Sequence, residues 1–232
     1  MRHENPSFRK FHFNKNAMKI FAAGTFLLTV LAMSALHATV LLKKVHAGPL
    51  MKYDIKSAIV TYDRLDTQKG VTTHTKEIVY FDDYGVTECH EVYDLSGGTP
   101  KLASGRYGKG EAEYRYNMTS KVAAWDSYDS TGVFPRFDLK EGSASLKKDE
   151  NYKEIAGDTI AGKFCDGVSC SPFADADVRC YGYKHILMKL YSDYPTYGNK
   201  MVLVATDIQE NVPIPPEKFA LPEGVVMEKM GK

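Results

Sequence analysis

The chain of 232 residues carries almost no net charge, because 30 basic side chains face 29 acidic ones and leave a formal charge of +1. A nucleic-acid interface needs a local excess of positive charge, which this composition does not indicate. Enzyme motifs are also missing: the sequence contains no G-x-S-x-G, H-E-x-x-H, P-loop or dinucleotide-binding fingerprint. These absences favour a non-enzymatic protein with no cofactor and no nucleic-acid partner.

Long hydrophobic runs are limited to one segment near the start of the chain, Met18 to Ala38. A lysine, an apolar run and then small residues follow one another there, as in a secretory signal peptide. Signal peptides end in small residues at the cleavage site, so cleavage is expected after Ala38 or after Ala47. Removal of residues 1–47 would leave 23 basic and 28 acidic residues, a net charge of −5.

The same run also fits an uncleaved membrane anchor. Ile20 to Leu42 is 23 residues long, enough to span ~30 Å of hydrocarbon at ~1.5 Å per residue. Met1 to Ala17 is polar and basic, and is either a long leading region or the product of a start assigned upstream of Met18. We therefore expect residues 1–47 to be a signal peptide or membrane segment, and residues 48–232 to form a single domain in the bacterial periplasm or outside the cell.

Cysteines are few, and all four follow the hydrophobic run. An even number in an exported chain predicts two disulfides. Cys170 and Cys180 flank a segment centred on Asp175 that resembles a hairpin turn, which pairs them and leaves Cys89 with Cys165. Free buried thiols are the alternative. A zinc site is disfavoured, because the spacings do not match the close cysteine pairs of tetrahedral sites, so no metal is expected.

Short β-branched and aromatic stretches follow one another along the rest of the chain. In the first, Ala58, Val60 and Tyr62 alternate with Ser57, Ile59 and Thr61, so we expect the two sets on opposite faces of a strand. Turn residues separate the stretches, which is typical of an antiparallel sheet. The predicted strands are Ile55–Leu65, Thr72–Phe81, Val86–Tyr93, Glu111–Asn117, Lys121–Tyr128, Lys163–Cys170, Val178–Tyr191 and Lys200–Gln209.

Two segments depart from this pattern. Gly142 to Tyr152 has a possible N-cap at Ser143, which predicts a short helix. Near the C-terminus, NVPIPPEKFALPEGV contains four prolines and cannot form a central strand. We expect an extended arm there, with one helical turn at Glu217 to Phe219.

The order of these pieces resembles that of a known group of proteins. The hairpin EIVYFDDYG, the strand entry IAGKFC and the ending VPIPPEKFALPEG are similar to those of the LolA-like/LppX-like periplasmic proteins, the superfamily of the outer-membrane lipoprotein carrier, especially its poorly characterised members. The resemblance covers roughly Tyr53 to Val226. It implies a mainly β (α+β) fold, a curved antiparallel sheet forming an unclosed barrel with a few short helices.

The resemblance also implies a non-enzymatic function, the binding of a lipid or other hydrophobic ligand in a half-barrel cavity of the cell envelope. Aromatic and aliphatic side chains on the predicted strands would line that cavity by burying acyl surface. The candidate lining residues are Val60, Tyr62, Tyr80, Tyr114, Tyr116, Trp125 and Leu187. The alternative is a protein-interaction module tethered to the membrane by Ile20–Leu42, which binds an envelope protein through an open sheet edge and has no small-molecule ligand.

Overall fold

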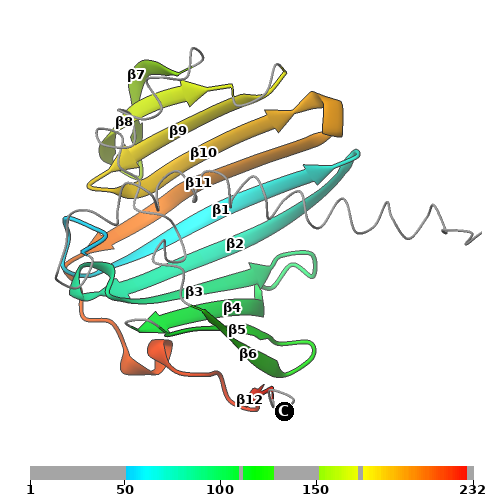
Figure 1. Cartoon of the computed structure of the whole chain (residues 1–232), viewed down its shortest axis with the longest axis vertical. Helices are drawn as coiled ribbons and strands as arrows, with labels where there is room; N and C mark the ends of the chain where they lie inside the picture. Colours follow the sequence, from blue (N-terminus) through cyan, green and yellow to red (C-terminus); the bar gives the residue numbers. More distant parts are fainter. Residues whose placement is uncertain (1–50, 110–111, 128–151, 172–174, 229–232) are drawn as a thin grey trace, which may run out of the picture.

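The computed structural model describes residues 51–109, 112–127, 152–171 and 175–228, which form one sheet and three short 3₁₀ helices (Figure 1). The strands are β1 Ala58–Gln68, β2 Val71–Asp82, β3 Thr87–Asp94, β4 Lys101–Lys109, β5 Ala112–Asn117, β6 Val122–Ser127, β7 Lys153–Ile160, β8 Lys163–Cys170, β9 Asp177–Tyr183, β10 Ile186–Tyr194, β11 Asn199–Glu210 and β12 Val226–Met227. The 3₁₀ helices are η1 Asp83–Gly85, η2 Pro195–Tyr197 and η3 Pro216–Phe219.

The twelve strands follow the order β12-β6-β5-β4-β3-β2-β1-β11-β10-β9-β8-β7. Two meanders, β1–β6 and β7–β11, therefore meet where β1 pairs with β11. Neighbouring strands are antiparallel throughout, except that β12 runs parallel to β6. The ladder does not close into a barrel, although β7 also contacts β11, which shows that the sheet curls at this end. The predicted curved, unclosed antiparallel sheet is confirmed.

Tight turns explain the hairpins. β1 and β2 are joined by Lys69 and Gly70, and β7 and β8 by Ala161 and Gly162, all four with positive φ. Two consecutive residues of positive φ form the turn that matches the twist of paired strands, and glycine adopts this conformation without strain. The turn from β9 to β10 contains Lys184 and His185 at φ 48° and 64° with no glycine.

The two faces of the sheet differ in burial. We call the face that carries Ala58, Val60, Tyr62 and Arg64 of β1 the core face, and the opposite one, with Ile59 and Thr61, the outer face. Ala58 and Val60 are fully buried, and Tyr62 is 2% exposed. The alternation predicted for this strand is thus confirmed.

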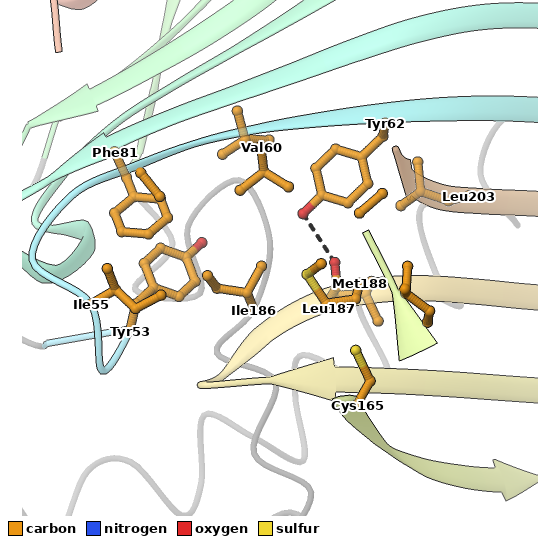
Figure 2. Close-up of a cluster of buried hydrophobic side chains, with 14 residues drawn as sticks. Tyr53, Ile55, Val60, Tyr62, Phe81, Cys165, Ile186, Leu187, Met188 and Leu203 are labelled. Atoms are coloured by element: carbon orange, nitrogen blue, oxygen red, sulfur yellow. Dashed lines mark hydrogen bonds between the residues drawn. The ribbon is translucent and has the colours of Figure 1, made fainter. Parts of the chain in front are cut away.

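A contiguous apolar cluster, the core cluster, lies on the core face where the sheet curls (Figure 2). Strands of both meanders contribute to it, and Tyr62 donates a hydrogen bond of 3.0 Å to the carbonyl of Leu187. The segment Met51–Ser57, here called the cover segment, places Tyr53 and Ile55 in the cluster. The buried members of the core cluster are Tyr53, Ile55, Ala58, Val60, Tyr62, Val79, Phe81, Ile160, Cys165, Ile186, Leu187, Met188, Leu203 and Ala205.

The outer face is covered by the C-terminal arm that follows β11. The Asn211 amide donates to the Ser57 carbonyl at 2.7 Å, which ties the start of the arm. In η3, the Lys218 ammonium donates to both carboxylate oxygens of Glu91 at 2.8 and 3.0 Å and lies 4.7 Å from the ring centre of Tyr80. The arm ends as β12 beside β6 (Figure 1). The predicted extended arm with one helical turn is confirmed.

Three strands and one turn escape the sequence prediction, the third strand being the two-residue β12. β4 and β7 were not expected, and the predicted strand Val178–Tyr191 is in fact β9 and β10, separated by Lys184 and His185. Because neither turn residue is glycine, the sequence carries no ordinary turn signal there. The other predicted strands agree with the observed ones to within a few residues.

Several predictions fall outside the described residues. The signal or anchor segment, with Ile20–Leu42 and both cleavage positions, lies before residue 51, and the predicted helix Gly142–Tyr152 lies outside them except for Tyr152. Among the residues that the structure describes, no helix has the length and apolar character needed to cross a membrane.

The structure does not support the predicted disulfides, since it joins none of the four cysteines by a disulfide bond. The hairpin between β8 and β9 exists, but Cys170 pairs with Val178 and Cys180 with Val168, so the two cysteines are offset by two residues. Cys89 lies in β3 and Cys165 in β8, with five strands between them. At about 4.8 Å per strand, this separation is far beyond the reach of a disulfide.

Replacement of Phe81 tests the core cluster. Phe81 is fully buried, and its ring centre lies 4.2 Å from that of Tyr53. We expect Phe81→Ala to lower the free energy of unfolding by about 3–5 kcal/mol, measured by urea denaturation. Phe164→Ala is the matched control, because Phe164 is 68% exposed, and should change it by less than about 1 kcal/mol. Equal losses in the two variants would contradict the assignment of the core.

The free thiols give a second test. Burial raises the pKa of Cys89 to about 12 and that of Cys165 to about 11, which suppresses the reactive thiolate at neutral pH. We expect iodoacetamide to label the folded protein slowly at these positions and to label all four cysteines after unfolding without reductant. The measurement is intact mass; two unlabelled cysteines per chain in urea would instead reveal a disulfide.

Candidate functional site

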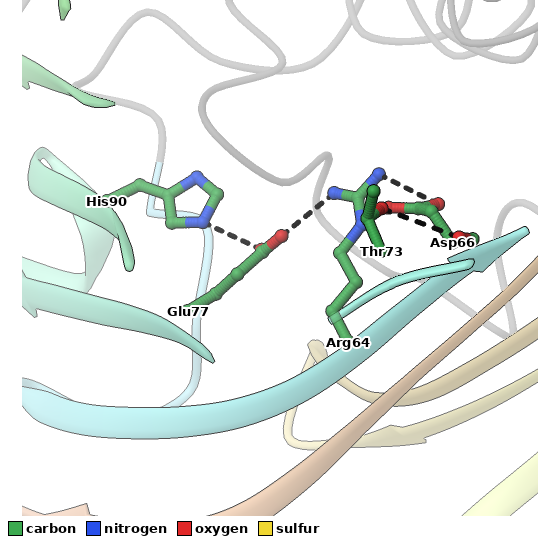
Figure 3. A network of polar contacts seen from close by, with 5 residues as sticks. All are labelled: Arg64, Asp66, Thr73, Glu77 and His90. Atoms are coloured by element: carbon green, nitrogen blue, oxygen red, sulfur yellow. Dashed lines mark hydrogen bonds and ion pairs between the residues drawn. The ribbon is translucent and has the colours of Figure 1, made fainter. Parts of the chain in front are cut away.

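A line of charged side chains crosses the core face beside the core cluster. Arg64 of β1 donates to Glu77 of β2 with 2.8 Å between Nη1 and Oε1, and to Asp66 with 2.6 Å between Nε and Oδ2 (Figure 3). The other Glu77 oxygen, Oε2, lies 2.8 Å from Nε2 of His90 in β3. Strand register explains the contacts, because Glu77 is opposite Tyr62 and His90 is opposite Val79, both on the core face.

Glu77 is held in its charged form. Its side chain is 1% exposed, and burial alone would raise the pKa of the carboxyl. The hydrogen bond and charge of His90, together with the charge of Arg64, outweigh burial and lower this pKa to about 2. A carboxylate of such low basicity, with both oxygens already bonded, is poorly suited to accept a proton in catalysis near neutral pH.

A second buried ion pair lies at the end of β3. Glu88 is on the core face opposite Phe81 and pairs with the Lys52 ammonium, and both side chains are 2% exposed. The Tyr53 hydroxyl donates to the other Glu88 oxygen at 2.5 Å. Because Lys52 and Tyr53 belong to the cover segment, this pair fixes the segment against the sheet. Removing one partner would leave a buried charge, which is strongly destabilising.

The line of charges continues onto β4 and β5. Arg106 lies directly opposite His90, and Arg115 lies directly opposite Arg106. The first of these arginines is half-buried and the second is exposed. We call Arg64, Glu77, His90, Arg106 and Arg115 the polar row. It places one residue on each strand from β1 to β5, adjoining the core cluster at Tyr62 and Val79.

The side chains of the polar row are ionisable, and three of them, Arg64, Glu77 and His90, are joined by hydrogen bonds. Within the described residues, no group of three or more histidine, cysteine, aspartate or glutamate side chains is arranged to hold a metal ion. The guanidinium groups are permanent cations with several N–H donors.

The structure separates the seven predicted lining residues. Val60, Tyr62 and Leu187 lie together in the core cluster on the core face. The other four lie on the outer face, since Tyr80 is opposite Ile59 and Tyr116 shares its side of β5 with Tyr114. Trp125 of β6 is opposite Tyr114. The seven residues therefore do not surround one common space.

The outer-face aromatics have a structural environment of their own. The Tyr93 hydroxyl donates to Glu91 at 2.7 Å, and Lys218 of the arm binds the same carboxylate. Tyr80 and Tyr116 are 7% and 4% exposed in this region, and burial together with the Glu91 charge raises the pKa of both. Farther along, the rings of Tyr107 and Tyr114 stack with centres 4.9 Å apart.

Sequence reasoning missed the polar row. Each of its residues lies within or beside a predicted strand except Arg106, whose strand β4 was not predicted. The sequence did hold a signal for two of its members. Glu77 and His90 are ionisable residues that lie next to strongly apolar positions in their predicted strands. Their proximity depends on the register between strands, which single-strand patterns do not contain.

No protein-family model matches the chain, and no curated protein matches it. Solved structures do resemble it. An uncharacterized conserved protein from Thermus thermophilus is 7% identical, covers 75% of this chain with 91% of its own, and has a TM-score of 0.47. MucB from the MucA/MucB complex of Pseudomonas aeruginosa is 9% identical, with a TM-score of 0.47; the match covers 78% of this chain and only 60% of that chain.

A LolA superfamily protein from Nitrosomonas europaea is also similar, at 8% identity and a TM-score of 0.36, over 74% of this chain and 93% of that one. The group expected from the sequence resemblance is thus represented among these solved structures. The fold of this chain is defined by its own strand order and registers.

Replacement of Glu77 tests the polar row. Its pKa falls from an ordinary 4.5 to about 2 in the folded state, so the stabilisation is complete above pH 4.5 and is lost as pH falls toward 2. We expect Glu77→Gln to lower the free energy of unfolding at pH 7 by on the order of 3 kcal/mol, with a smaller difference from wild type at pH 2.5. Urea denaturation at both pH values measures this effect.

The control for Glu77→Gln is Glu223→Gln, at an exposed position of the arm, which should change stability by less than about 0.5 kcal/mol. If the loss in Glu77→Gln were the same at pH 2.5 as at pH 7, the ion pairs of Glu77 would not be its cause.

Proposed function

We propose that this chain is a non-enzymatic, exported protein of the bacterial cell envelope that binds a lipid or other hydrophobic ligand on its core face. The observation that carries the proposal is the composition of that face, where a continuous apolar cluster lies directly beside a row of charged groups. Amphiphilic ligands need both kinds of surface. The secretory signal predicted from Met18–Ala38 and the resemblance of the sequence to LolA-like proteins support the same function.

The ligand's apolar part would lie against the core cluster, where Tyr53 and Ile55 of the cover segment lie over Phe81 and Ile186 (Figure 2). Opening this surface requires the segment to move, which costs its contacts with the buried Glu88 but leaves strand pairing intact. Buried apolar area favours binding by about 25 cal/mol per Å². Three predicted lining residues, Val60, Tyr62 and Leu187, belong to this surface, and we place the ligand there rather than against the outer-face aromatics.

The alternative, a tethered module that binds a protein partner through a sheet edge, has weaker support. β7 is the outermost strand at its end of the described sheet. It contains a bulge between Ile155 and Asp158 and exposes Lys153 and Glu154, features that discourage pairing with another strand. At the other end, β12 covers part of β6.

The single tryptophan of the chain allows a direct test of where the ligand lies. Trp125 is on the outer face and is 46% exposed, whereas a Phe81→Trp, Trp125→Phe double variant would place the reporter in the core cluster. A brominated fatty acid quenches tryptophan fluorescence only at short range. We expect saturable quenching of the tryptophan at position 81 and little quenching of Trp125 in the wild-type protein.

Quenching of Trp125 alone would place the ligand on the outer face and contradict this assignment. The absence of saturable quenching in both proteins, together with no lipid co-purified from membrane extract in native mass spectrometry, would exclude the proposed function. N-terminal sequencing of the exported protein tests the tether, because a start at Gly48 would remove Ile20–Leu42 entirely and a start at Thr39 would leave only its last four residues.

A further inference from the structure

The outer face holds a buried carboxylate whose neighbours form a binding site for a lysine side chain. Glu91 of β3 is 6% exposed and accepts hydrogen bonds from the Tyr93 hydroxyl at 2.7 Å and from the Lys218 ammonium at 2.8 and 3.0 Å. The ring centre of Tyr80 lies 4.7 Å from the same ammonium. A carboxylate and an aromatic ring together recognise an ammonium group. We call Tyr80, Glu91 and Tyr93 the lysine site.

Lys218 reaches this site from the C-terminal arm, which crosses the outer face with few polar ties. The arm starts at a reciprocal tie, in which the Asn211 amide donates to the Ser57 carbonyl and the Ser57 hydroxyl donates to the Val212 carbonyl, both at 2.7 Å. It ends as β12 beside β6 (Figure 1). Between these two ends, the hydrogen bonds to the sheet that the described residues show come from Lys218. The arm is thus a separate layer fastened in the middle by one lysine.

Prolines allow the arm to move as a unit. Pro213, Pro215 and Pro216 lie between the first tie and Lys218, and proline has no N–H to bond to the sheet. Proline-rich segments are extended and act as semi-rigid spacers. Such a spacer can carry Lys218 onto the sheet of its own chain, as in the structure, or onto the same site of a neighbouring molecule.

Apolar side chains are left exposed where the arm ends. Val226 and Met227 of β12 are both exposed. Met227 lies opposite Ala123 of β6, and the exposed Trp125 is two residues farther along that strand. Neighbouring apolar side chains on a surface mark a site of interaction. This edge of the sheet therefore carries surface that a second chain would cover.

We propose that the lysine site also takes Lys218 from the arm of a second copy of this chain, so that two copies exchange their arms. A second copy is the partner whose complementarity the structure already shows, because every contact of the arm within one chain can form in the same way between two. Exchange of an identical element is therefore a low-cost route to a dimer. The inference concerns the outer face and does not depend on a ligand at the core face.

The experiment combines two charge-reversal variants of the full exported chain. Lys218→Glu places a second carboxylate beside Glu91, and Glu91→Lys places a second ammonium beside Lys218, so neither variant alone can seat its arm in its own chain or in an identical copy. In an equimolar mixture, exchange of arms restores an opposite-charge pair at both sites. The variants are mixed in urea and refolded together by dialysis. Native mass spectrometry then identifies monomers, homodimers and the heterodimer.

Cys89 reports whether the arm is seated. Its thiol is buried on the outer face, opposite Tyr80, whereas Cys165 lies near the other end of the sheet and is an internal control. We expect iodoacetamide to label Cys89 in each single variant about tenfold or more faster than in wild type, with Cys165 unchanged. In the mixture, a heterodimer should form and the labelling rate of Cys89 should return toward that of wild type.

Two further variants are controls. The chain that carries both Lys218→Glu and Glu91→Lys restores the pair within one molecule, and it should fold and protect Cys89 like wild type, as checked by circular dichroism and labelling. Lys200→Glu reverses the charge of an exposed lysine on β11 and should change neither the mass nor the labelling of Cys89.

A mixture that stays monomeric while Cys89 is still labelled fast would overturn the inference, because the lysine site would then accept Lys218 only within one chain. Homodimers in the single variants, as abundant as the heterodimer in the mixture, would overturn it too, since the lysine site cannot be what joins them. Labelling of Cys89 at the wild-type rate in both single variants would show that Lys218 does not fasten the arm, which also contradicts the inference. Lipid binding at the core face is tested separately by the quenching experiment.

Discussion

The central constraint on this molecule is that an open sheet has two faces and that each must be covered wherever it carries apolar side chains. The described residues meet it without an α-helix. The end of the sheet from β11 to β7 curls until β7 reaches β11, and the cover segment adds Tyr53 and Ile55 to the enclosed cluster. On the other side, the C-terminal arm covers the aromatic residues around Cys89 and Glu91. The two ends of the domain thus serve as its second layer.

Buried charges on the core face follow from the same arrangement. β2 and β3 contribute Phe81 and Val79 to the core cluster but also Glu77, Glu88 and His90 to the same face. Each buried carboxylate is compensated by two donors, Glu77 by Arg64 and His90, and Glu88 by Lys52 and Tyr53. The network stabilises the fold and also creates a boundary between apolar and ionic surface. That boundary is the basis of the proposed binding site.

Sequence patterns predicted this architecture well at the level of single strands and poorly between strands. Alternation placed Ala58, Val60 and Tyr62 on one face, because burial repeats with the period of the strand. The same reasoning has no access to register, so it grouped Tyr62 with Tyr80 although they lie on opposite faces of neighbouring strands. It also paired Cys170 with Cys180 across a turn whose register offsets them by two residues. The polar row was missed for this reason as well.

The seam between β1 and β11 has a consequence for how the chain reaches its native state. Every other antiparallel pair joins strands that follow each other along the sequence, whereas β1 pairs with a strand about 140 positions later in the sequence. Local hairpins form fast and distant pairings slowly, so the seam is the expected late step of folding. A chain crossing a membrane from its N-terminus would meanwhile expose β1 as an unprotected edge and hold only half of its apolar residues together. The time during which the chain can aggregate therefore depends on how soon the second meander folds and β11 pairs with β1.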